Sequence, residues 1–160
     1  QMGSGYRGDL WLARSGKGKI VNVTPADYRY FAIKVGFKSQ LVPGKNKPNG
    51  CIKLEIFDDG IKKIGPEYFG TGGDANNRYE ILGASEISTT EPNVLYYDLQ
   101  SKYKTVTPTD WNQVFDLVQC KFVIADFPET AQTYDLYWIR SFKSIEELQA
   151  FVDSENNTNE

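Results

Sequence analysis

Apolar and polar residues alternate with a period of two in short segments along much of the chain, a pattern typical of β-strands. In residues 30–37, Phe31, Ile33, Val35 and Phe37 fall on one face, which suits a half-buried strand. Turns rich in Gly, Pro and Asn separate such segments. The other segments of this kind are residues 10–13, 19–23, 51–57, 78–82, 94–99, 120–125 and 134–142.

Most of these segments follow one another without a helical pattern between them, which argues against a parallel α/β sheet. The predicted fold class is all-β, a jelly roll or β-sandwich of two antiparallel sheets with a short C-terminal helix. Ser144 and Glu147 form a capping-box pattern that begins this helix. A shorter helical turn is predicted over residues 109–115. The apolar residues at helical spacing after the capping box are Ile145, Leu148, Phe151 and Val152.

The length of 160 residues is that of one domain, which we expect to span residues 6–152. Residues 1–5 have the composition of a cloning-tag remnant. The natural protein could therefore carry an export signal that this sequence does not include. Residues 153–160 are all polar and are predicted to be a linker or tail. A domain with such a tail suits a longer modular protein, whose other modules would be its partners.

Charge and composition narrow the classes of function. A net charge of −3 and a pI of about 5.1 argue against a nucleic-acid partner. No run of about 18 apolar residues occurs, so no membrane insertion is predicted. His is absent, which removes most hydrolase triads, most zinc sites and the commonest general base. Cys51 and Cys120 read as two buried free thiols, with a disulfide left open.

Without His, acidic residues are the remaining candidates both for catalysis and for metal binding. The strand-borne carboxylates include no pair that stands out by spacing as a glycosidase pair, and a solvated strand face explains them. Residues 58–60 and 72–77 hold the oxygen ligands that calcium needs, although ordinary turn chemistry accounts for both. No cofactor is therefore predicted, and a structural calcium remains an alternative. The strand-borne carboxylates are Glu55, Glu80, Asp98 and Asp135.

Aromatic residues inside polar, Asn-rich sequence favour ligand binding, because flat rings stack on sugar C–H faces while amides and charged groups bind hydroxyls. Trp111 lies between Asp110 and Asn112, and for each such aromatic residue packing at a core edge is the competing explanation. Trp138 lies in an apolar strand and is expected in the core. Of Tyr96 and Tyr97, which point to opposite faces, one is expected to be exposed. The predicted ligand-binding residues are Trp111, Trp11, Tyr68, Phe69, Asn76, Asn77 and Arg78.

Three segments, residues 28–35, 94–99 and 134–144, resemble accessory modules of gut Bacteroidetes glycan-utilisation proteins. The last of them carries Trp138-Ile139-Arg140 followed by Phe142 and the capping box. Those modules are similar to galactose-binding-type β-sandwich carbohydrate-binding modules, attached to glycoside hydrolases or surface lipoproteins. The resemblance spans residues 9–152 and implies a non-catalytic role at the cell surface, in the periplasm or outside the cell. It transfers no particular binding residue and allows a structural calcium.

Three functions are therefore compared. The first is a module that holds an enzyme or receptor on a polysaccharide or oligosaccharide, with xylan or another plant glycan as ligand. The second is a structural spacer or protein-interaction module without a sugar site, in which Trp11, Trp111 and Tyr68 are all packed. The third is a small glycosidase or lyase, which requires a carboxylate pair facing one cleft.

Overall fold

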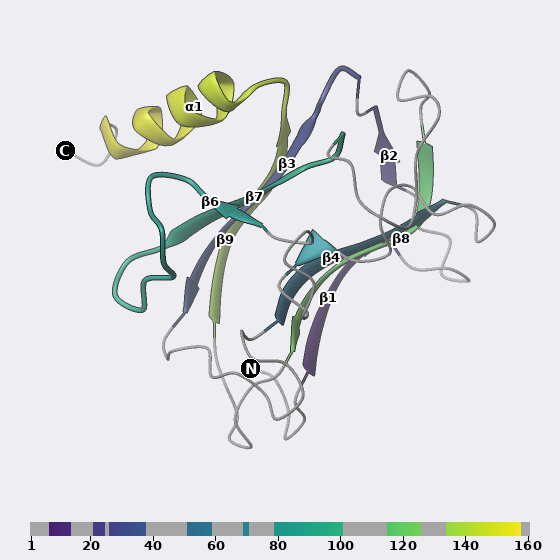
Figure 1. The fold of residues 1–160 in the computed structure, drawn as a ribbon, viewed down its shortest axis with the longest axis horizontal. Coiled ribbons are helices and arrows are strands. Elements are labelled where there is room, and N and C mark those ends of the chain that lie inside the picture. Colours follow the sequence, from purple (N-terminus) through teal and green to yellow (C-terminus); the bar gives the residue numbers. More distant parts are fainter. Residues whose placement is uncertain are drawn as a thin grey trace.

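The computed structural model describes residues 7–13, 21–24, 26–37, 51–58, 69–70, 79–100, 115–125 and 134–157. This part of the chain is mostly β, every strand pairing in it is antiparallel, and one helix follows the last strand (Figure 1). The elements are β1 (Arg7–Ala13), β2 (Val21–Val23), β3 (Tyr30–Phe37), β4 (Cys51–Asp58), β5 (Phe69–Gly70), β6 (Glu80–Ile81), β7 (Asn93–Asp98), β8 (Phe115–Ala125), β9 (Tyr134–Phe142) and α1 (Ile145–Asn157).

The strands form two hydrogen-bonded sheets. The first sheet has the order β1-β8-β4-β5, with β2 also paired to β8. The second sheet has the order β6-β7-β3-β9. The predicted strands at 30–37 and 134–142 coincide with β3 and β9, whereas the alternation at 78–82 yields only the two-residue strand β6. The short strand β5 lies in the Gly-rich region, where the sequence predicts no strand.

One face of the second sheet is buried as the alternation predicts. Phe31, Ile33, Val35 and Phe37 of β3 are all buried. The register pairs Phe31 with Tyr97 of β7, which is 1% exposed. Because antiparallel partners point to the same face, β7 extends the apolar surface of β3. The second sheet is therefore built around its central strands β3 and β7.

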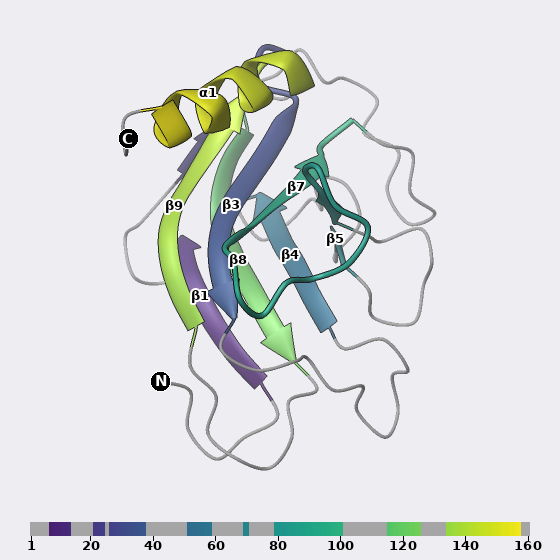
Figure 2. The ribbon, with the colours of Figure 1, turned by 90° about the vertical axis from the view of Figure 1, so that its left-hand side faces the viewer.

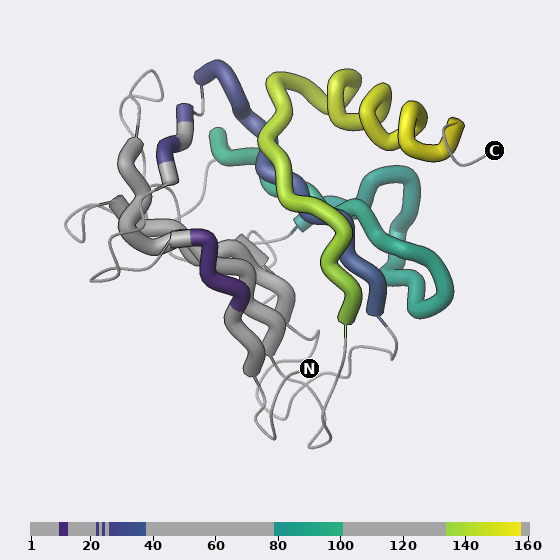
Figure 3. Tube along the Cα trace, turned by 180° about the vertical axis from the view of Figure 1, so that it is seen from behind, coloured from purple at the N-terminus to yellow at the C-terminus, as the bar shows by residue number. Residues whose placement is uncertain are grey.

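Helix α1 covers part of the opposite face of the second sheet. Leu148 of α1 is fully buried in a cluster with Ala32, Val94 and Phe142, one from each of the strands β3, β7 and β9. Seen from behind, α1 leaves the end of β9 and extends to the same side of the sheet as the segment between β6 and β7 (Figure 3). Both faces of this sheet therefore carry buried side chains, and α1 packs against one of the two faces.

The capping box at the start of α1 is confirmed, with one difference in its partner. The Glu147 N–H donates to Ser144 Oγ at 3.2 Å, and Glu147 Oε2 accepts from the Lys143 N–H at 2.7 Å. The helix runs to Asn157, so residues 153–157 of the predicted polar linker or tail are helical. The reason is tertiary, because Glu155 in this polar segment bonds to two side chains of the second sheet.

Two further predictions concern residues of the first sheet, the helical turn at 109–115 and the pairing of the two cysteines. Phe115 begins β8 and pairs with Val23, so the helical turn predicted over 109–115 does not include its last residue, and residues 109–114 lie outside the described part. Cys51 and Cys120 lie on paired strands, but Cys120 faces Ile56. Cys51 is five positions from Ile56 along β4, or about 17 Å at ~3.3 Å per residue. The two cysteines are therefore too far apart to form a disulfide with each other.

Candidate functional site

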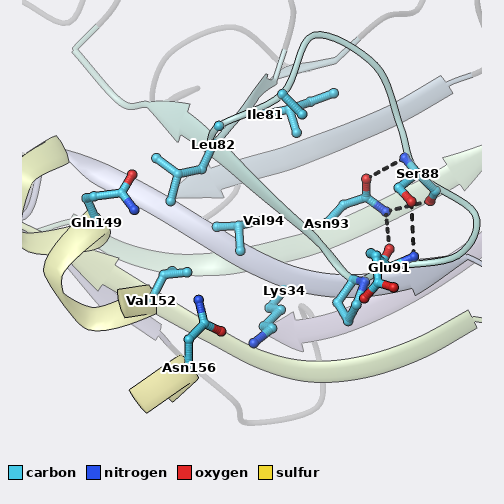
Figure 4. Close-up of a pocket in the computed structure, with 13 residues that line it drawn as sticks. Lys34, Ile81, Leu82, Ser88, Glu91, Asn93, Val94, Gln149, Val152 and Asn156 are labelled. Atoms are coloured by element: carbon cyan, nitrogen blue, oxygen red, sulfur yellow. Dashed lines mark hydrogen bonds between the residues drawn. The ribbon is translucent and has the colours of Figure 1, made fainter. Parts of the chain in front are cut away.

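A cavity of about 490 Å³ lies over the second sheet, between α1 and the β6–β7 loop, defined as residues 82–92 (Figure 4). Lys34 of β3 and Val94 of β7 contribute to it from the sheet. Apolar side chains lie beside polar ones, the combination typical of small-molecule sites. Its apolar lining residues are Ile81, Leu82, Ala84, Pro92, Val94 and Val152. Its polar lining residues are Lys34, Ser88, Glu91, Asn93, Gln149 and Asn156, with Gly83 completing the set.

The β6–β7 loop is held by the side chain of Asn93, the first residue of β7. Asn93 is 4% exposed, and its Nδ2 donates to the Ser88 carbonyl at 2.8 Å while its Oδ1 accepts from the Ser88 N–H at 2.8 Å. The Ser88 hydroxyl accepts from the Glu91 N–H at 3.0 Å. A buried amide is stable only when its polar atoms are bonded, so these contacts favour one loop conformation. We call this side of the cavity the loop wall.

The loop wall begins at a turn that glycine makes possible. Gly83 has a φ of 74°, in the left-handed region where a side chain would be strained. The preceding residue, Leu82, donates its N–H to the Val94 carbonyl at 2.9 Å, which extends the pairing of β6 and β7 by one residue. The chain then leaves the sheet at Gly83 and returns at Asn93, so both ends of the loop wall are fixed.

The other side of the cavity, the helix wall, is formed by Gln149, Val152 and Asn156 of α1. Glu155 connects this part of the helix to the sheet, because its Oε2 lies 3.0 Å from Lys34 Nζ and its Oε1 accepts from Trp138 Nε1 at 3.0 Å. Trp138 also packs edge-on against Phe151, with ring centroids 5.3 Å apart. The prediction that Trp138 packs in the core agrees with these contacts, although its indole N–H bonds to the helix.

A β-bulge places an exposed aromatic residue beside the cavity. Lys34 pairs with Trp138 and Val35 pairs with Leu136, so Tyr137 is an extra residue between them. The Tyr137 ring covers Gly36, where an added Cβ would lie 3.5 Å from the ring, and Lys34 Nζ is 5.7 Å from the ring centroid. Tyr137 is 54% exposed. Its ring therefore lies on the Lys34 side of the sheet, close to one residue of the cavity lining, although Tyr137 itself does not line the cavity.

Negative charge surrounds the cavity on both walls. Glu91 of the loop wall is exposed, and Gln149 donates to Asp153 Oδ1 at 2.8 Å on the helix side. Lys34 is the cationic side chain in the cavity lining, and Glu155 lies against it. An ammonium that already has a carboxylate partner attracts a further anion only weakly. The described surroundings of the cavity thus carry more negative than positive charge.

Of the four carboxylates considered for catalysis, the three whose side chains the structure describes do not line the cavity. Asp98 binds Arg29 through two bonds, at 2.7 and 2.6 Å, and these raise the pKa of Arg29. Glu80 faces Tyr96 across the β6–β7 pair, and Asp135 lies exposed on β9. Burial, with Glu80 as a further cause, raises the pKa of Tyr96. Glu55 lies on β4, and its side chain is outside the described residues.

Tyr96 and Tyr97 occupy opposite faces of β7, as expected, but neither is fully exposed. Tyr97 is buried on the face of Phe31 and Leu95. Tyr96 is half-buried and packs edge-on against Tyr30, with ring centroids 6.1 Å apart. The expectation of one exposed ring is wrong because the hydrophobic cluster beneath α1 covers part of the Tyr96 face.

The structure describes few of the residues predicted to bind ligand. Trp11 is half-buried on β1 opposite Lys121, and the backbone of Phe69 pairs with Leu54 in the first sheet. The other predicted residues, Tyr68, Asn76, Asn77, Arg78 and Trp111, lie outside the described part. Their role as a binding surface stays a prediction.

Sequence reasoning missed the cavity and Tyr137. Alternation along residues 134–142 gives no sign of a bulge, because a bulge is defined by pairing with another strand. Gln149 and Asn156 lie on the polar side of a predicted helix or in its predicted tail, where amides are ordinary. The sequence does hold one signal of the bulge, the adjacent aromatic residues Tyr137 and Trp138. Strict alternation would place these two rings on opposite faces of the sheet.

The described residues offer neither a clustered metal site nor a membrane-spanning helix. Among the described residues, no group of three or more His, Cys, Asp and Glu side chains is placed to hold a metal ion. Calcium binding at 58–60 or 72–77 stays a prediction, because most of these residues lie outside that part. In the same part of the chain, no helix has the length and apolar character needed to cross a membrane.

The chain was compared with known proteins. No curated protein and no solved structure matches it. One family model, described as a domain of unknown function (DUF4979), matches residues 1–148, which end within α1 and include all the strands. Because this match covers most of the chain, the protein belongs to the DUF4979 family.

Proposed function

We propose that this domain binds a polysaccharide or oligosaccharide without transforming it, and that the sugar occupies the cavity between the loop wall and the helix wall. The observation that carries the proposal is a cavity lined by both amide and apolar side chains, with the exposed Tyr137 ring 5.7 Å from Nζ of the lining residue Lys34. A volume of about 490 Å³ is typical of a ligand pocket.

The two kinds of lining residue match the two kinds of surface on a sugar. The C–H face of a pyranose ring packs on apolar and aromatic groups, which Val94, Val152 and Tyr137 supply. Sugar hydroxyls both donate and accept hydrogen bonds, and so do the carboxamides of Gln149 and Asn156. Both amides are on exposed helix residues and reach the cavity (Figure 4).

The cavity is also largely formed in advance. Asn93 holds the loop wall, and Glu155 together with Leu148 holds the helix wall against the sheet. A preformed site costs less conformational entropy on binding than one assembled around the ligand. This arrangement suits a module whose task is retention on a glycan.

The finer features of the proposal follow the resemblance of the sequence to accessory modules. We propose a β-sandwich, supported by the second sheet lying in front of the first in Figure 2 and by the buried apolar face of β3. We further propose that the domain belongs to a longer protein at the cell surface, in the periplasm or outside the cell. There it would hold an enzyme or receptor on xylan or another plant glycan.

Affinity electrophoresis tests the proposal. The chain is run through gels that contain xylan, mixed-linkage glucan, mannan, galactan or no polysaccharide. Tyr137→Ala, Gln149→Ala and Asn156→Ala are each expected to weaken retardation about tenfold, or ~1.4 kcal/mol. Tyr28→Ala is the matched control, because Tyr28 is also an exposed tyrosine but lies beside Lys143, before β3 begins.

The outcomes separate the three candidate functions. Retardation lost in the cavity variants and kept in Tyr28→Ala supports glycan binding at this site. Retardation kept in all three cavity variants but lost in Trp111→Ala or Trp11→Ala moves the binding surface to those tryptophans. No retardation on any glycan contradicts the proposal and favours the spacer, and release of reducing sugar from any glycan favours the glycosidase.

A further inference from the structure

Resting on the proposed function, we infer that the cavity selects uncharged glycans and rejects those that carry carboxylate or sulfate groups, with Glu91 as the residue that enforces this choice. The inference concerns the class of ligand, which neither the family nor the fold assigns. It depends on the charges around the cavity and on the partners these charges already have.

The cation in the cavity lining is already neutralised. Lys34 Nζ lies 3.0 Å from Glu155 Oε2, and the Lys34 side chain is only 18% exposed. A glycan carboxylate that approached Lys34 would also approach Glu155, so attraction to the one is offset by repulsion from the other. Lys34 can still donate hydrogen bonds to neutral hydroxyls, because an ammonium has three donors.

The remaining charges at the cavity are negative. Glu91 lines the cavity from the loop wall and is exposed. Its main chain is fixed, since its N–H donates to Ser88 Oγ at 3.0 Å and its carbonyl accepts from Asn93 Nδ2 at 3.4 Å. On α1, the Asp153 carboxylate accepts from Gln149 of the helix wall, although Asp153 does not itself line the cavity. An anionic sugar therefore meets repulsion chiefly from Glu91 on the loop wall.

A matched pair of polymers tests this inference. Hydroxyethyl cellulose and carboxymethyl cellulose share one backbone and differ in charge, and arabinoxylan and glucuronoxylan form a second pair. We expect the wild-type chain to bind the neutral member of at least one pair about tenfold more tightly than the acidic member. The preference is expected to shrink in about 0.5 M NaCl, where the screening length falls to a few ångströms.

Glu91→Gln removes the charge and keeps the shape and an acceptor oxygen. We expect it to bind the acidic polymer several-fold more tightly than the wild-type chain does, so that the ratio of neutral to acidic affinity falls. Glu86→Gln is the matched control, because Glu86 is an exposed glutamate of the same β6–β7 loop that does not line the cavity. It should leave both affinities unchanged.

The results separate failure of this inference from failure of the proposed function. Binding of the acidic polymer as tight as that of the neutral one, at low salt and sensitive to Tyr137→Ala, overturns the inference and leaves glycan binding in place. An equal effect of Glu91→Gln and Glu86→Gln also overturns it, because the discrimination would then come from net charge. Absence of binding to every polymer overturns both.

Discussion

The two walls of the cavity are held by different kinds of contact. The loop wall is fixed mainly by residues close together in sequence, since Asn93 bonds to Ser88 and Glu91 within its own turn, with a longer bond of 3.5 Å to the Val35 carbonyl on β3. The helix wall is fixed by residues far apart, since Glu155 bonds to Lys34 on β3. The loop wall therefore depends mostly on its own turn, whereas the helix wall requires the folded sheet.

This difference sets what each wall can tolerate. Substitutions that damage the helix wall should loosen α1 and leave the loop in place, because the loop bonds do not involve the helix. Substitutions in the turn should loosen the loop and leave α1 docked. Hydrogen exchange measured separately over residues 82–92 and 145–157 distinguishes the two responses.

The largest expected effect comes from Leu148→Ala. Leu148 is fully buried beneath α1, and its loss should destabilise the domain by about 2–5 kcal/mol in urea unfolding. Exchange should rise more over 145–157 than over 82–92, where Leu82 packs against the same cluster as Leu148. The exposed neighbour Gln149 is the control, and Gln149→Ala should cost less than ~0.5 kcal/mol. A Leu148→Ala cost of that small size would show that α1 is not packed on the sheet as described.

The second effect comes from Asn93→Ala in the loop wall. The substitution leaves the Ser88 N–H and carbonyl without their buried partner, at an expected cost of about 1–3 kcal/mol. Exchange should rise over 82–92 while α1 keeps its protection. Thr90→Ala, at an exposed position of the same turn, should be nearly neutral. Loss of protection in both walls together would contradict their independence.

The third effect comes from Glu155→Gln, which removes the ion pair with Lys34 and keeps an acceptor for Trp138 Nε1. Both side chains are partly exposed, so the expected cost is below ~1 kcal/mol and should fall further at high salt. Urea unfolding at two salt concentrations measures it. Glu146→Gln is the control. Glu146 is an exposed residue of the same helix, and its substitution should break no contact with the sheet. If both variants lowered the free energy of unfolding equally and independently of salt, the ion pair between Glu155 and Lys34 would contribute nothing to stability.

The smallest expected effect on stability comes from Tyr137→Ala. The ring is more than half exposed, and its described neighbours are Gly36 and the Lys34 ammonium, so the free energy of unfolding should change by less than ~0.5 kcal/mol. Its effect on glycan retention should nevertheless equal that of the cavity amides. A large loss of stability would assign Tyr137 a structural role and weaken the case for it as a sugar-stacking residue.

The sequence predicted the parts of the fold that depend on local pattern. Alternation placed β3 and β9, and the capping box placed the start of α1. It failed where tertiary contacts decide. Helix α1 continues through residues 153–157 because Glu155 meets Lys34 and Trp138, and no local pattern in that polar segment indicates such partners.

The candidate site was harder to predict for the same reason. The cavity joins residues from β3, the β6–β7 loop, β7 and α1, which are distant in sequence. Tyr137 lies close to Lys34 of the cavity lining through a bulge that depends on the register with β3. The aromatic residues in Asn-rich segments, Trp111 and Tyr68 among them, were selected by composition alone, and their binding role stays a prediction.

Hydrogen exchange with and without a retained polysaccharide shows whether glycan binds between the two walls. We expect ligand to protect residues 82–92 and 149–157 together, since these segments carry the loop wall and the helix wall. Protection confined to residues 59–78 and 101–114, with both walls unchanged, would contradict it and place the glycan on the segments that carry Tyr68 and Trp111.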